Sequence, residues 1–297
     1  MEQLGMRPNF IVVGAHKAGT TSLYMYLKQH PEIFMPELKE PRFFAYDETS
    51  HAHQRLSRQT FPVRTLKEYD ALFNADSSCK AVGEASPEYL NSPIAAERIR
   101  ELIPEAKIVV TLRQPTERLY SLYQMILRSG QTDASFVDWV KANLASDEYT
   151  KQTMYYYQNL KRYFRLFEPE QIKVCIFDDL TNNATQVMQD LYSFLEVDQH
   201  FVPDTTRQFN KGGLPKNQLL HNVLSSKKLA MKYRRFVPAI IRNLVGNLRD
   251  QNLRKAPELE KTTKDALAAL LTEDIQNVET LIGRDLSRWR DDNAAQD

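Results

Sequence analysis

Residues 10–23 place small, basic and hydroxyl-bearing side chains directly after a short apolar run. The run from Phe10 to Val13 predicts a buried strand, and the spacing from Ala18 onward predicts a helix. A glycine-bracketed turn between a strand and a helix start points backbone N–H groups at a phosphate. The predicted phosphate-binding residues are Lys17, Ala18, Gly19, Thr20, Thr21 and Ser22.

The order of residues in this loop differs from that of an ATP- or GTP-binding P-loop. In a P-loop a lysine follows the second glycine and the next hydroxyl binds Mg²⁺, whereas here Thr20 follows Gly19 and the lysine is Lys17. We therefore predict a nucleotide whose reacting bridge is neutralised by lysine and not by a metal ion. A P-loop kinase or ATPase is the alternative enzyme class, and it would require Mg²⁺.

A second block with the same arrangement begins at Ile108. Ile108 to Leu112 is another short, β-branched apolar run, and Arg113 follows it at once. Ser121 lies about two helical turns beyond Pro115, so its hydroxyl and the Arg113 guanidinium can reach one anion. A guanidinium binds phosphate oxygens in a bidentate manner. The alternative is an arginine that only caps a neighbouring carbonyl group at the end of a strand.

In this order, the two blocks resemble the nucleotide site of sulfotransferases that use 3′-phosphoadenosine-5′-phosphosulfate (PAPS). The resemblance implies that residues Lys17 to Ser22 bind the 5′-phosphosulfate and that Arg113 and Ser121 bind the 3′-phosphate. Lys17 would also act in catalysis, by stabilising the charge that builds on the bridging oxygen. The same resemblance implies a P-loop-like central parallel sheet, 3′-phosphoadenosine-5′-phosphate (PAP) as the product, and a reaction without a metal ion.

The segment Lys39-Glu40-Pro41-Arg42-Phe43-Phe44 resembles the Glu-x-His-Phe-Phe segment that supplies the catalytic base of glycan sulfotransferases of the heparan sulfate type. The resemblance makes Glu40 the general base, because a sugar hydroxyl attacks poorly until a positioned base takes its proton. Lys39, Arg42 and Phe43 become candidate substrate-binding residues, and Arg42 replaces the histidine. The implied acceptor is a carbohydrate hydroxyl or amine. Glu40 could otherwise be a loop carboxylate that only pairs with Lys39 or Arg42.

A second candidate carboxylate is Glu84, in the segment Gly83 to Tyr89. This segment resembles the family's Glu-Lys-[Ser/Thr]-Pro-x-Tyr sequence, but Ala85 stands where the family has an active-site lysine. Glu84 is therefore a candidate base, a group that orients the substrate, or a buried carboxylate that caps the helix after Ser86. Ala85 also leaves open a non-catalytic relative that binds nucleotide or glycan without turnover.

Composition and charge limit the class of protein. Apolar runs of strand length alternate with helical stretches throughout residues 1–297, which predicts a single α/β domain with helices on both faces of a parallel sheet. The formal net charge of +1 gives no reason to expect a nucleic-acid partner. Two cysteines, Cys79 and Cys175, are too few for a disulfide framework and favour a reducing, cytoplasmic setting. No apolar run is long enough to span a bilayer.

Residues 205–260 are predicted to form a basic loop and helical segment beside the cleft. Between Lys211 and Lys264 the chain has thirteen lysines and arginines and three acidic residues. By the family resemblance, Lys211 and Gly212 are expected to contact the nucleotide near its 3′-phosphate or adenine. Residues 227–249 have an amphipathic basic pattern, which fits a lid over the cleft, a peripheral helix at a membrane surface or a solvated helix packed on the sheet.

Overall fold

The computed structural model describes most of the chain. The described residues are 7–50, 53, 60–146, 153–206, 213–217, 220, 248, 251–254 and 256–290. Lys211, Gly212 and nearly all of the amphipathic pattern at 227–249 lie outside these residues, so what we expect of them stays a prediction. Among the described helices, none has the length and apolar character needed to cross a membrane.

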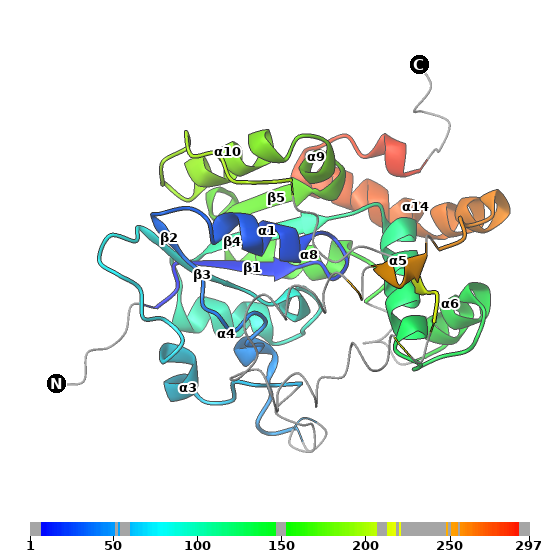
Figure 1. Ribbon diagram of the computed structural model, residues 1–297, viewed down its shortest axis with the longest axis horizontal. Coiled ribbons are helices and arrows are strands. Elements are labelled where there is room, and N and C mark those ends of the chain that lie inside the picture. Colours follow the sequence, from blue (N-terminus) through cyan, green and yellow to red (C-terminus); the bar gives the residue numbers. More distant parts are fainter. Residues whose placement is uncertain are drawn as a thin grey trace.

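The centre of the protein is a five-stranded sheet in which each pair of neighbouring strands is parallel. In spatial order the strands are β2 (Ile33–Phe34), β3 (Ala81–Ala85), β1 (Phe10–Gly14), β4 (Lys107–Leu112) and β5 (Ile172–Ile176). Helices cover both faces of this sheet (Figure 1). The predicted α/β class with a central parallel sheet is confirmed.

The central strand β1 shows why the sheet needs cover on both faces. All of its residues are buried; Phe10 and Val12 belong to one hydrophobic core, whereas Ile11 and Val13 belong to the other. Successive side chains of a strand point to opposite faces, so an apolar run without polar alternation must be covered on both sides.

The helices divide between these two cores. The core of Phe10 and Val12 is closed by α1 (Thr20–Leu27), α9 (Phe177–Asn182) and α10 (Ala184–Phe194). The opposite core contains residues of α3 (Leu66–Asp70), α4 (Ala95–Leu102), α5 (Pro115–Arg128), α6 (Phe136–Leu144), α8 (Tyr157–Leu166) and α14 (Lys261–Ile282). The other described elements are 3₁₀ helices at Phe43–Ala45, Pro87–Leu90, Pro169–Gln171 and Ser287–Trp289, and the antiparallel pair β6 (Leu214–Pro215) and β7 (Leu253–Arg254).

The strand order places the two predicted anion-binding blocks side by side. β1 lies between β3 and β4, so the chain builds β3 and β2 on one side of β1 and β4 and β5 on the other. In open parallel sheets a ligand binds beyond the carboxyl ends of the strands, at the point where the strand order reverses. Residues 15–19 leave the end of β1 and Arg113 leaves the end of β4, at this same edge.

The long C-terminal helix α14 is joined to the rest of the fold through Asp274. Its buried carboxylate accepts hydrogen bonds from the backbone N–H groups of Tyr156 and Tyr157, at 2.8 and 2.9 Å, and so satisfies donors at the start of α8. Burial raises the pKa of Asp274. The helix ends where Gly283 adopts the left-handed conformation, at φ 63°.

Candidate active site

A cleft of about 1440 Å³ opens at the carboxyl ends of β1 and β4. Its volume exceeds the roughly 300–1,000 Å³ of a typical small-molecule site, which leaves room for a nucleotide and an acceptor together. The predicted residues that line it are Lys17, Gly19, Thr20, Thr21, Ser22, Glu40, Arg42, Arg113 and Ser121. Four others, Ala18, Lys39, Phe43 and Glu84, lie outside its lining.

The loop between β1 and α1 is held in place by β4. The Ala15 N–H donates to the Thr111 carbonyl at 2.7 Å, and the Thr111 hydroxyl donates to the Gly14 carbonyl at 3.0 Å. Gly19 begins α1 in the left-handed region, at φ 88°, and a Cβ there would lie 2.9 Å from the Phe177 ring. Because Gly19 brings no side-chain cap, the first turn of α1 faces the cleft with its backbone N–H groups.

Lys17 is surrounded by other cations. Burial is the main cause that lowers the pKa of its ammonium group, to about 8, and the nearby Arg128 and Arg113 guanidinium groups lower it further. Like charges gathered in one cleft repel each other unless an anion lies between them. The cations of Lys17 and Arg113 at the cleft favour an anionic ligand there.

The backbone of Arg113 is held by hydrogen bonds, whereas its side chain can exchange its present partner for a ligand. The buried Tyr156 hydroxyl donates to the Arg113 carbonyl at 2.9 Å and accepts from its N–H at 3.3 Å. The guanidinium donates to Glu117 at 2.9 and 3.1 Å and lies 4.6 Å from the centre of the Phe177 ring. An ion pair to so exposed a carboxylate contributes less than about 1 kcal/mol, so a phosphate can replace Glu117.

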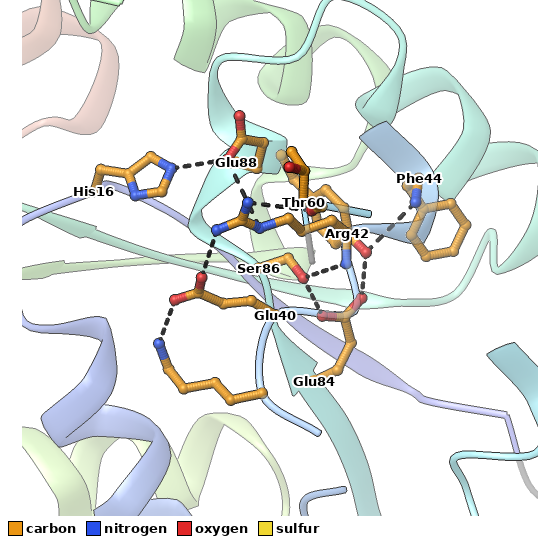
Figure 2. Close-up of polar contacts among 10 residues, drawn as sticks. His16, Glu40, Arg42, Phe44, Thr60, Glu84, Ser86 and Glu88 are labelled. Carbon is orange, nitrogen blue, oxygen red and sulfur yellow. Dashed lines mark hydrogen bonds and ion pairs between the residues drawn. The ribbon is translucent and has the colours of Figure 1, made fainter. Parts of the chain in front are cut away.

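Glu40 lies at the cleft between two cations (Figure 2). Lys39 Nζ donates to its Oε1 at 2.7 Å, and Arg42 Nη2 donates to its Oε2 at 2.8 Å. Burial acts to raise the pKa of Glu40, but Lys39 and then Arg42 outweigh it and bring the pKa down to about 2. The backbone of both Glu40 and Arg42 has positive φ, at 61° and 58°. This tight bend turns the two side chains toward each other.

Glu84 is placed quite differently, on β3 beside the central strand β1. It is fully buried, and it accepts hydrogen bonds from three hydroxyl groups: Tyr89 at 2.6 Å, Ser86 at 2.8 Å and Tyr69 at 3.3 Å. Burial raises the pKa of this carboxyl to about 7. These contacts make Glu84 the centre of a buried polar network beneath the cleft wall.

That network supports the backbone of the loop that carries Glu40. The Ser86 hydroxyl accepts from the Arg42 N–H at 3.1 Å, and the Tyr89 hydroxyl accepts from the Phe44 N–H at 3.4 Å. Phe43 is 6% exposed and stacks on Tyr69, with ring centres 4.6 Å apart. Phe43 therefore packs in the core and does not line the cleft, so its position does not support the predicted contact with substrate.

The sequence reasoning missed His16, which lines the cleft, and its partner Glu88. His16 Nε2 lies 3.2 Å from Glu88 Oε2, and Arg42 Nε lies 3.9 Å from the same oxygen. Burial opposes the charged form of Glu88, yet the hydrogen bond from His16 and the charges of His16 and Arg42 lower its pKa. The available signals were that His16 directly precedes Lys17 and that Glu88 lies between Pro87 and Tyr89.

A model of the sulfotransferase family matches residues 8–201, which is well over half of the 297 residues. The chain belongs to the sulfotransferase family. The matched stretch contains the phosphate loop, both glutamates, Arg113 and Ser121, and it ends before the basic segment.

Similar proteins include a human enzyme and a bacterial one. The bifunctional heparan sulfate N-deacetylase/N-sulfotransferase 3 of Homo sapiens is 28% identical over 209 residues, which are 65% of this chain and 23% of the human protein. The chain thus spans about a quarter of the length of this curated relative. A crystal structure of a sulfotransferase from Alicyclobacillus acidocaldarius superposes with a TM-score of 0.72 at 29% identity, covering 96% of this chain and 100% of that one.

The fold is also similar to that of a mouse sulfotransferase, SULT7A1, whose structure is a complex with PAP. The TM-score is 0.54 at 12% identity, and the match covers 93% of this chain and 86% of that one. At this identity the likeness concerns the fold alone. Among the described residues, no group of three or more His, Cys, Asp or Glu side chains could hold a metal ion.

Proposed function

We propose that this protein transfers a sulfuryl group from PAPS to a hydroxyl or amine of an acceptor. The observation that carries the proposal is that the Lys17 loop and the Arg113–Ser121 pair, predicted from separate sequence blocks, line one cleft. PAPS has anionic groups at both its 5′ and its 3′ positions and so fits two such groups. ADP and ATP have a single anionic chain.

The donor half of the cleft is proposed to bind and polarise PAPS. The first turn of α1 and Lys17 would hold the 5′-phosphosulfate, and Arg113 with Ser121 would hold the 3′-phosphate. As the bond between sulfur and the bridging oxygen breaks, negative charge builds on that oxygen. Lys17 stabilises this charge without reorganisation, because the loop is already fixed to β4.

The acceptor half is proposed to deprotonate the incoming group through Glu40. Of the two candidate glutamates, Glu40 lines the cleft and Glu84 does not. With a pKa of about 2, Glu40 is fully ionised at neutral pH but weakly basic. We therefore expect the proton to move late, when the bond from the acceptor to sulfur is largely formed, as suits a loose in-line displacement. Lys39 and Arg42, which hold Glu40, are the proposed substrate-facing cations.

The acceptor is proposed to be a carbohydrate. The human relative is a heparan sulfate N-deacetylase/N-sulfotransferase, and the loop from Lys39 to Phe44 resembles a segment of glycan sulfotransferases. Transfer of radioactive sulfur from labelled PAPS to N-desulfated heparan sulfate tests an amine acceptor. Transfer to heparosan, which offers hydroxyl groups, tests the alternative, and label in neither would exclude this polysaccharide class.

The donor is tested by thermal stabilisation with PAP, ADP and Mg·ATP, on the wild type and on Arg113→Ala. A ligand at a hundredfold its dissociation constant stabilises a protein by about 2.7 kcal/mol, which is a clear shift in Tm. We expect PAP alone to raise the Tm of the wild type and to lose most of this effect in Arg113→Ala. Arg165→Ala is the control, because Arg165 is 68% exposed on α8 and outside the cleft lining. Equal or greater stabilisation by Mg·ATP would overturn the proposal in favour of a kinase or ATPase.

A further inference from the structure

His16 lies on the cleft side of the phosphate loop, directly before Lys17. Its Nε2 is 3.2 Å from Glu88 Oε2, and none of the described residues forms a hydrogen bond or ion pair with its Nδ1. A ring that is held at one nitrogen and left with the other unpaired at a cleft is placed to contact a ligand.

A row of three contacts connects His16 to the proposed base. Glu88 Oε2 lies 3.2 Å from His16 Nε2 and 3.9 Å from Arg42 Nε, and Arg42 Nη2 lies 2.8 Å from Glu40 Oε2. Figure 2 shows Arg42 between Glu88 and Glu40, with His16 on the far side of Glu88. His16 therefore belongs to the loop proposed to hold the donor and is connected, through Glu88 and Arg42, to the carboxylate proposed to meet the acceptor. The group that passes between these two places is the sulfuryl group.

We propose that His16, as an imidazolium, donates its Nδ1–H to an oxygen of the sulfuryl group, while Glu88 orients the ring by accepting from Nε2–H. This inference rests on the proposed function and adds a catalytic residue to it. In the step, the acceptor atom forms a bond to sulfur, and the bond from sulfur to the bridging oxygen breaks with its electron pair left on the phosphate of PAP. The proton of the acceptor goes to Glu40, and His16 keeps its own.

The charges around His16 decide which role its ring can take. The groups facing it are the Glu88 carboxylate in direct contact, Arg42 and Glu40 beyond Glu88, and Lys17 next in the chain. With Nε2–H donated to Glu88, Nδ1 is a donor only when the ring is protonated and an acceptor when the ring is neutral. The negative charge on the oxygens of a transferring group calls for a donor.

Comparing PAPS with PAP tests this contact, because PAP lacks the sulfuryl group that His16 is proposed to touch. Dissociation constants are measured without acceptor for the wild type and for His16→Asn. Loss of one charged hydrogen bond should weaken PAPS binding about tenfold and leave PAP binding within about twofold. Equal weakening of both ligands, or of neither, overturns the proposal. If the wild type binds neither ligand, the proposed function fails first, and this inference fails with it.

The direction of the pH dependence separates a donor from a base. For a donor, the preference of the wild type for PAPS over PAP must fall more steeply with rising pH than that of His16→Asn, in which the 5′-phosphate of PAP still titrates, with a pKa of about 6. For a base, the preference of the wild type would not fall more steeply than that of His16→Asn.

Two comparisons separate the effect of His16 from the effects of other titrating groups. Lys17, whose pKa is about 8, is present in both the wild type and His16→Asn, so its titration contributes to both pH profiles and cancels when the two are compared. His200→Asn is the matched control, since His200 is exposed and lies outside the cleft lining. A preference that rises with pH, or one that His200→Asn alters as His16→Asn does, would also overturn the proposal.

Discussion

Two glutamates predicted from neighbouring motifs, Glu40 and Glu84, have opposite environments. Glu40 lines the cleft between Lys39 and Arg42, and these cations lower its pKa to about 2 against the effect of burial. Glu84 is fully buried among three neutral hydroxyl groups, and burial raises its pKa to about 7. The two motifs alone do not show which carboxylate can meet a substrate. That depends on whether its partners are cations or neutral hydroxyl groups and on whether it reaches the cleft.

The two glutamates are still mechanically connected. Ser86 donates to Glu84 and accepts from the backbone N–H of Arg42, whose side chain holds Glu40. A change at Glu84 can therefore reach Glu40 through the loop, whereas a change at Glu40 leaves the buried network intact. Substituting Glu40, Glu84 and Ser86 one at a time therefore separates a direct role in catalysis from a role in holding the loop.

The largest expected effect is on activity in Glu40→Gln. Loss of a general base lowers kcat by about 10²- to 10⁴-fold, while the affinity for PAP should stay close to that of the wild type. The measurement is PAPS turnover beside a PAP titration. Glu196→Gln is the control, because Glu196 also pairs with a lysine, Lys107 at 2.7 Å, but is exposed outside the cleft lining. A Glu40→Gln protein with unchanged kcat would support the non-catalytic alternative.

The next largest effect is on stability in Glu84→Ala. The substitution leaves the hydroxyl groups of Tyr69, Ser86 and Tyr89 without their acceptor in a buried site, so we expect the free energy of unfolding to fall by about 3 kcal/mol. Urea denaturation measures this loss. If Glu84→Ala kept full stability and lost only activity, the assignment of the two glutamates would have to be exchanged.

The two glutamates should also give opposite dependences of stability on pH. The folded pKa of Glu40 lies below its ordinary value of 4.5, so its contribution to stability is present above that pH and is lost as pH falls toward 2. The folded pKa of Glu84 lies above 4.5, so its contribution is present below that pH and is lost as pH rises toward 7. The urea midpoint should therefore depend less on pH than in the wild type, below pH 4.5 for Glu40→Gln and between pH 4.5 and 7 for Glu84→Gln. Identical pH profiles for the two variants would contradict the comparison.

The smallest effect is expected for Ser86→Ala, which cuts the connection between the two sites. Loss of one buried hydroxyl should reduce stability by about 1 kcal/mol, and a less firmly held Arg42 should lower kcat by less than about tenfold. Parallel measurement of kcat and urea midpoint gives both numbers. A fall in kcat as large as that of Glu40→Gln would place the buried network in the chemistry itself.

Much of the donor half could be predicted from the sequence because its residues are consecutive. An apolar strand followed by Gly14, Lys17 and Gly19 predicts a strand, a tight turn and the start of a helix. The parallel order of β1 and β4 then brings Arg113 to the same edge of the sheet. The acceptor half was predicted less well. Phe43 was expected at the substrate and packs on Tyr69 instead, because an aromatic next to a tight bend can point to either side.

The sequence by itself determined the α/β class and predicted the phosphate-binding loop at residues 17–22 and the Arg113–Ser121 pair, since each prediction depends on residues a few positions apart. Only the tertiary structure decided which glutamate faces the cleft, and only it brought His16, Glu88 and Arg42 into one row. Those three residues come from separate segments of the chain, and only the fold places them in contact. Such long-range electrostatic contacts leave no periodic pattern in a sequence, because they are set by how strands and loops meet at the end of a sheet.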